Sequence, residues 1–124
     1  MIDFSTSSVF KLTHIDPAEI QPQIAALLLE DERLLVAAKT VRDFVVFTDK
    51  RILAVNVQGM TGKKRDFTSL PYSKIQAFSV ETAGTFDLDA ELTLWFSGLG
   101  MVHFEFRGAF DVTYLAKLIG SKVL

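Results

Sequence analysis

The sequence contains no cysteine among its 124 residues. Disulfides, thiolate nucleophiles and cysteine-based metal sites are therefore excluded. No apolar run approaches the roughly 20 residues that a helix needs to cross a bilayer. The first ten residues, MIDFSTSSVF, also lack the basic region and the apolar core of a signal peptide. We therefore expect a cytoplasmic protein.

A strong charge of one sign is also lacking, since the formal net charge is −2. This balance argues against a general nucleic-acid-binding protein, which needs a basic surface. Apolar residues make up 49% of the chain and charged residues 23%, which indicates one globular domain with a real core. Phenylalanine supplies 11 residues against two tyrosines and one tryptophan, so we expect a phenylalanine-rich core.

The charged residues are nevertheless unevenly placed along the chain. Residues 76–106 contain no lysine or arginine, and they carry Glu81, Asp87, Asp89, Glu91 and Glu105. The preceding stretch, residues 59–74, carries Lys63, Lys64, Arg65 and Lys74 against a single acidic residue, Asp66. One edge of the fold is therefore predicted to be basic and another acidic.

The pattern of apolar residues predicts a helix at each end of a series of strands. Asp16-Pro17-Ala18-Glu19 is typical of a helix start, and Pro22 restarts a helix that should run to about Leu29. Strands are predicted at 34–39, 43–48, 51–58, 65–70, 75–81, 90–97 and 101–107, followed by a helix over about 110–122.

The strands around the Asp49-Lys50 turn are apolar on both faces. A two-residue loop pairs Phe47 with Ile52 and Val45 with Ala54. Both faces of this hairpin should therefore be covered. The candidate covers are the first helix and a second subunit.

The final strands alternate clearly between apolar and polar residues. A loop formed by Gly98-Leu99-Gly100, with Gly100 in a left-handed conformation, aligns the apolar faces. This register predicts that Trp95 lies opposite His103 and that Glu91 lies opposite Arg107.

The predicted fold is mainly β. Its elements are an N-terminal helix, seven strands and a C-terminal helix, in that order. Seven antiparallel strands hide their edges by closing into a barrel, which the last helix would cap. We divide the chain into an N-terminal segment, residues 1–15, and one domain, residues 16–124.

Five sets of residues in this order resemble the bacterial pleckstrin-homology (PH) domain family. They are Val41-Arg42-Asp43, Phe47 to Arg51, Gln58-Gly59 with Gly62-Lys63-Lys64, Leu70-Pro71-Tyr72 with Ile75, and Glu81 to Glu91. The resemblance implies a PH-like barrel with a capping helix and cyclic homo-oligomers. It implies no established activity.

The glycine-rich segment Gly59 to Lys64 differs from a nucleotide phosphate loop. It lacks the GxxxxGK spacing followed by Ser or Thr, and it joins two strands. We interpret it as a turn that faces solvent or a partner. In the alternative, residues 59–65 bind an anionic ligand or a membrane surface through Lys63, Lys64 and Arg65.

Neither a metal site nor a catalytic set has the expected spacing. Glu81, Asp87, Asp89 and Glu91 do not follow a calcium-loop pattern, so a charged surface is favoured. The chain has two histidines and no GxSxG motif, which argues against a hydrolase. A structural ion-pair set that fixes the strand ends of the central hairpin is predicted from Arg42, Asp43, Asp49 and Arg51. Ligand recognition by Arg42 or Arg51 is the alternative.

The sequence therefore predicts a non-enzymatic PH-like interaction module, without cofactor or metal, that self-assembles into a cyclic homo-oligomer. An unidentified protein partner also fits this prediction. The candidate ligand or interface residues are Arg42, Arg51, Lys63, Lys64, Arg65, Asp87, Asp89, Glu91, Trp95 and His103.

Overall fold

The structure, a computed structural model, describes residue 4, residues 11–108 and residues 110–124. The strands are β1 (Lys11–Ile15), β2 (Leu34–Lys39), β3 (Phe44–Thr48), β4 (Arg51–Gln58), β5 (Lys64–Pro71), β6 (Ile75–Glu81), β7 (Ala90–Phe96) and β8 (Gly100–Phe106). The helical elements are η1 (Pro17–Glu19), α1 (Gln21–Ile24), η2 (Ala25–Leu27), η3 (Tyr72–Lys74) and α2 (Val112–Val123).

The strands form one open sheet rather than the predicted closed barrel of seven strands. Its eight strands lie in the order β5-β4-β3-β2-β1-β8-β7-β6, so β5 and β6 are its edges. The prediction missed β1, which pairs antiparallel with β2 and parallel with β8. Most of the predicted N-terminal segment, residues 1–3 and 5–10, lies outside the described residues.

The chain turns a corner between β5 and β6, the two edge strands of the open sheet. Pro71 ends β5, and the 3₁₀ turn Tyr72–Lys74 leads into β6. The buried Tyr72 hydroxyl donates a hydrogen bond of 2.7 Å to the Thr48 carbonyl, which ties this corner to β3. The two strands on either side of the corner do not pair with each other.

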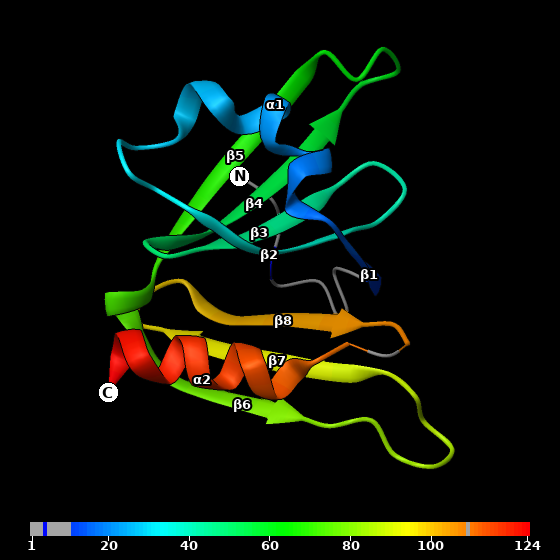
Figure 1. Ribbon diagram of the computed structural model, residues 1–124, viewed down its shortest axis with the longest axis vertical. Helices are drawn as coiled ribbons and strands as arrows, with labels where there is room; N and C mark the ends of the chain where they lie inside the picture. Colours follow the sequence, from blue (N-terminus) through cyan, green and yellow to red (C-terminus); the bar gives the residue numbers. More distant parts are fainter. Residues whose placement is uncertain (1–3, 5–10, 109) are drawn as a thin grey trace.

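The sheet bends into two halves around the main core. Figure 1 shows β2 to β5 in the upper half and β6 to β8 in the lower half, with α2 lying along β6 and β7. Side chains from both halves and from α2 meet in this core, and Phe47, Phe104 and Phe106 are fully buried there. The expected phenylalanine-rich core is therefore confirmed.

The β3–β4 hairpin has the predicted register and is buried on both faces. Phe47 pairs with Ile52 and Val45 with Ala54. These four residues lie in the main core, whereas Phe44, Val46, Leu53 and Val55 lie in a second apolar cluster. Ile20 and Ile24 cover the second cluster, so both covers come from this chain and no second subunit is needed there.

The first turn at Asp16 to Glu19 is present, but the helix predicted from Pro22 to about Leu29 is wrong. Asp16 does cap the first turn, because its carboxylate accepts a hydrogen bond of 2.9 Å from the Ala18 amide. The chain then forms three short turns, η1, α1 and η2, instead of one helix. Pro17 and Pro22 supply no amide hydrogen for a continuous helical ladder. The C-terminal helix is confirmed, and Asp111 caps it.

The register of the last hairpin differs from the prediction by two residues. Trp95 lies opposite Met101, Thr93 opposite His103, and Glu91 opposite Glu105. The same side chains still face outward, because a shift of two residues preserves the face of a strand. Gly100 has the predicted positive φ, of 93°.

We expect Gly100→Ala to destabilise the fold by about 1 kcal/mol or more, because an L side chain is strained at this φ. A Cβ atom there would meet no heavy atom within 4 Å, so the cost comes from the backbone alone. Gly84→Ala is the control, since Gly84 has no positive φ and its Cβ would lie 3.7 Å from the Asp87 carbonyl. Equal unfolding free energies for the two variants in urea would contradict this account.

Candidate functional site

The candidate residue Arg51 belongs to a buried ion pair with Glu32. The Arg51 Nε and Nη2 atoms donate to the two Glu32 carboxylate oxygens at 3.0 and 2.9 Å. The Glu32 side chain is fully buried, and that of Arg51 is 16% exposed. The Thr48 hydroxyl and the Leu29 amide also donate to this carboxylate, at 2.6 and 3.0 Å.

This network engages all three nitrogens of the Arg51 guanidinium. Its remaining donors reach the Ser69 hydroxyl at 2.9 Å and the Leu27 carbonyl at 2.7 Å. Burial opposes ionisation of Glu32, but hydrogen bonds from Arg51, Thr48 and the Leu29 amide favour the carboxylate and leave the pKa of Glu32 below its usual value. Arg51 therefore joins η2, β4 and β5, and its acidic partner is Glu32 rather than the predicted Asp43 or Asp49.

The basic loop, residues 59–65, begins as a tight turn between β4 and β5. Gly59 and Gly62 have positive φ, as a turn requires, and the Gly62 amide donates to the Gly59 carbonyl at 3.3 Å. The Arg42 guanidinium also donates to the Gly59 carbonyl. Arg65 reaches the Gln23 side chain at 2.7 Å. Arg42 and Arg65 thus fix the loop, and Lys63 and Lys64 remain exposed.

The acidic loop, residues 82–89, joins β6 to β7. Figure 1 places this loop and the basic loop at opposite ends of the longest axis of the molecule. Asp87 is exposed, and its carboxylate accepts a hydrogen bond of 3.0 Å from the Asp89 amide. Each loop also carries a fully exposed apolar side chain, Met60 in the basic loop and Phe86 in the acidic loop.

The outer face of β6 to β8 points away from the main core and has two chemically different ends. At its apolar end, Trp95 lies between Ala77 and Met101 in the strand register. Trp95 is 39% exposed and Met101 52% exposed. This end is an apolar surface patch, and its Trp95–Met101 pair replaces the predicted Trp95–His103 pair.

The other end of this face gathers ionisable side chains. Glu81, Glu91 and Glu105 occupy matching positions on three adjacent strands. His103 Nε2 lies 3.8 Å from a Glu91 oxygen and 3.9 Å from a Glu105 oxygen. Burial, the hydrogen bond with Glu81 and the repulsion of Glu81 and Glu105 raise the pKa of Glu91, while His103 lowers it.

Sequence reasoning singled out Glu91 and His103 but did not bring them together. It grouped Glu91 with Asp87 and Asp89, and it left Glu105 outside the candidate residues. The missing signal was the hairpin register, since the true pairing of Glu91 with Glu105 places His103 beside both.

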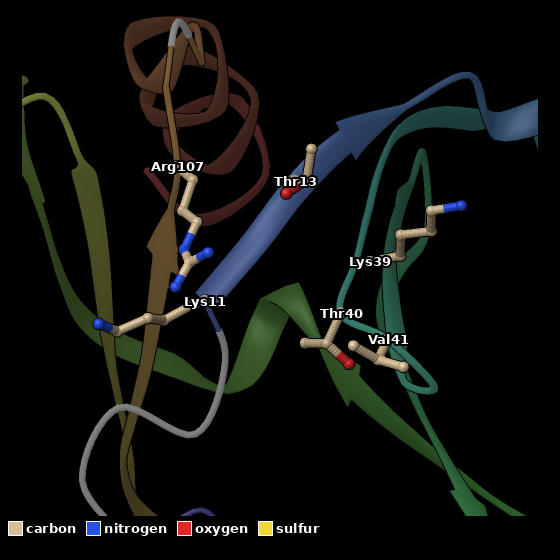
Figure 2. A pocket seen from close by; sticks show the side chains of 6 residues that line it. All are labelled: Lys11, Thr13, Lys39, Thr40, Val41 and Arg107. Carbon is tan, nitrogen blue, oxygen red and sulfur yellow. The ribbon is translucent and has the colours of Figure 1, made fainter.

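A cavity of about 510 Å³ lies between β1 and the β2–β3 loop and is lined by Lys11, Thr13, Lys39, Thr40, Val41 and Arg107. Figure 2 shows the Lys11 and Lys39 side chains extending in opposite directions, while Arg107 points toward Lys11. Lys39 is also 3.5 Å from the Glu19 carboxylate. The three cations therefore do not converge on one ligand position.

A mainly antiparallel sheet bent around the main apolar core, with a C-terminal helix against it, is the architecture of PH-like domains. A family model described as the bacterial PH domain matches residues 3–123. The chain therefore belongs to the bacterial PH domain family.

A curated protein and two solved structures are similar to this chain. The uncharacterized protein YjqA of Bacillus subtilis is 55% identical over 84 residues, which are 68% of this chain and 67% of that protein. A crystal structure of a protein with a pleckstrin-homology domain from Shewanella loihica is 38% identical, with a TM-score of 0.77, and the match covers 92% of this chain and 98% of that one. A pleckstrin homology domain from Shewanella amazonensis is 42% identical, with a TM-score of 0.65, over 89% and 90% of the two chains.

In the described part of the chain, no helix is both long enough and apolar enough to cross a membrane.

We expect Glu32→Gln to lower the unfolding free energy at neutral pH by about 2 kcal/mol, because it removes a charged hydrogen-bond partner. Since the pKa of Glu32 is lowered on folding from 4.5, its stabilisation is present above that value and is lost as pH falls through the lower folded value. The variant should therefore lose less stability on acidification than the wild-type protein.

Urea unfolding monitored between neutral and acidic pH measures both effects. Glu30→Gln is the matched control, because Glu30 is an exposed residue near Glu32. The role given to the Glu32–Arg51 pair is wrong if the two variants unfold alike at every pH.

Proposed function

We propose that this chain is a non-enzymatic PH-like interaction module that assembles head to tail with copies of itself into a ring. The observation that carries this proposal is the position of the two charged loops at opposite ends of the longest axis. A surface that complements a different surface on an identical copy gives a head-to-tail contact, and such contacts close into rings or extend into filaments. The cytoplasmic location and an additional protein partner stay predictions.

Each loop combines charge with exposed apolar area. The basic loop presents Lys63 and Lys64 beside Met60, whereas the acidic loop presents Asp87 beside Phe86 and the 63%-exposed Leu88. Apolar burial supplies most of the free energy of such a contact, and charge complementarity sets its register. The patch around Trp95 adds exposed apolar area on the same lower half of the molecule as the acidic loop.

The buried β3–β4 hairpin cannot contribute to this contact. Sequence analysis considered its apolar residues as a surface for a second subunit, but Val45, Val46, Ala54 and Val55 are fully buried within one chain. We assign the apolar part of the contact to the exposed loop residues and the Trp95 patch.

We expect the wild-type protein to have a mass several times that of the 13.8 kDa chain by light scattering at micromolar concentration. Lys63→Glu combined with Lys64→Glu should return it toward the monomer mass, because the basic loop then repels the acidic loop. Adding Asp87→Lys and Asp89→Lys should partly restore the assembly, since the two loops are again opposite in charge.

Lys50→Glu combined with Lys117→Glu is the matched control, because it changes the net charge equally at exposed positions outside both loops. A monomeric wild-type protein would refute the ring. An assembly that responds equally to the control and to the loop reversal would refute the assigned contact.

The alternative function is recognition of an anionic ligand or membrane surface by the basic loop. The exposure of Lys63 and Lys64 favours it, but Arg65 is already held by Gln23. The cavity in Figure 2 offers no converged set of cations in its place. Self-assembly is therefore the better-supported function.

We expect the wild-type protein to remain in the supernatant when anionic vesicles are sedimented at about 10 mM salt, where charges act over roughly 30 Å. Neutral vesicles are the control for nonspecific sedimentation. The alternative function would instead be supported by sedimentation that disappears at high salt and with the Lys63→Glu, Lys64→Glu variant.

A further inference from the structure

The ionisable end of the outer face brings an imidazole between two carboxylates. Glu91 lies on β7, whereas His103 and Glu105 lie on β8, and one ligand atom from each falls within 4.8 Å of the other two. All three side chains are partly buried, with 31%, 22% and 19% of their side-chain surface exposed, respectively. They lie on paired strands, which hold side chains more firmly than a loop does.

The distances in this cluster suit ligands of a metal ion better than hydrogen-bonded partners. His103 Nε2 is 3.8 and 3.9 Å from the nearest carboxylate oxygens, which is beyond hydrogen-bond distance. Two ligands placed at about 2.1 Å from a tetrahedral zinc ion lie about 3.4 Å apart. The two distances from His103 Nε2 are within about 0.5 Å of that spacing, and all three ligand atoms lie within 4.8 Å of one another.

A fourth residue, Thr93, orients the imidazole. Its hydroxyl lies 2.9 Å from His103 Nδ1, on the opposite side of the ring from the two glutamates. Metal-binding histidines commonly use the second ring nitrogen in this way, and the contact fixes the orientation of the ring. Nε2 is thereby directed toward Glu91 and Glu105.

The ligand types of Glu91, His103 and Glu105 determine which metal ions the cluster suits. Calcium and magnesium favour sites made of oxygen ligands, whereas an imidazole with two carboxylates suits zinc and similar divalent transition metals. Glu81, the register partner of Glu91, adds a third carboxylate beside this set. Lys11, the register partner of Glu105, is the neighbouring cation that competes for these carboxylates.

We propose that Glu91, His103 and Glu105 form a binding site for a divalent transition-metal ion such as Zn²⁺, with Thr93 as a positioning residue. Three protein ligands leave a further coordination position for water or for a side chain of another molecule. The proposal does not depend on the self-assembly of the chain.

Isothermal titration of metal-free protein with Zn²⁺ tests the site. We expect one ion per chain, a loss of this binding in His103→Gln, and affinity about tenfold or more weaker in Thr93→Val. The matched control is His14→Gln, because His14 is the only other histidine of the chain and should leave binding unchanged. Saturating Ca²⁺ should not compete.

Glu105→Gln provides a second test if His103→Gln fails to fold, and it should weaken Zn²⁺ binding without affecting the contact between Thr93 and His103. Melting temperatures measured without metal show whether each variant is folded. Absence of Zn²⁺ binding by the wild-type protein would overturn the proposal, and so would equal binding by wild type and a folded His103→Gln or Glu105→Gln variant.

Discussion

The structure depends on the burial of the β3–β4 hairpin from both sides. An antiparallel hairpin with apolar residues on both faces is stable only if two separate layers exclude water from it. The main core supplies one layer, and the short turns that carry Ile20 and Ile24 supply the other. Arg51 holds this second layer in place, because its guanidinium joins the Leu27 carbonyl to the buried Glu32 carboxylate.

This arrangement also determines how the polar surfaces are presented. The turns that cover the hairpin include Gln23, which holds Arg65, and Arg42 binds the start of the same loop. The basic loop is thus fixed at its base, with its lysines exposed. On the lower half of the sheet, strand alternation separates a phenylalanine-rich inner face from an outer face with one apolar and one ionisable end.

Sequence patterns were sufficient for the β3–β4 hairpin, whose register depends on local contacts. The two-residue turn at Asp49-Lys50 leaves one register that buries both faces, so the pairing of Phe47 with Ile52 could be predicted. The glycines of the last loop allow more than one turn, and registers that differ by two residues bury the same side chains. That ambiguity concealed the cluster of Glu91, His103 and Glu105. The place of β1 could not be predicted either, because it depends on pairing with β8, which is distant in sequence.

Trp95 is an intrinsic fluorescent probe of the outer face of β6 to β8. It is the only tryptophan of the chain, and it lies partly exposed at the apolar end of this face, two residues along β7 from Thr93. The tryptophan fluorescence of the protein therefore originates from one known position. Covering that position with another molecule would shift the emission to shorter wavelengths without any label. Binding at this face can consequently be followed separately from binding at the distant basic loop.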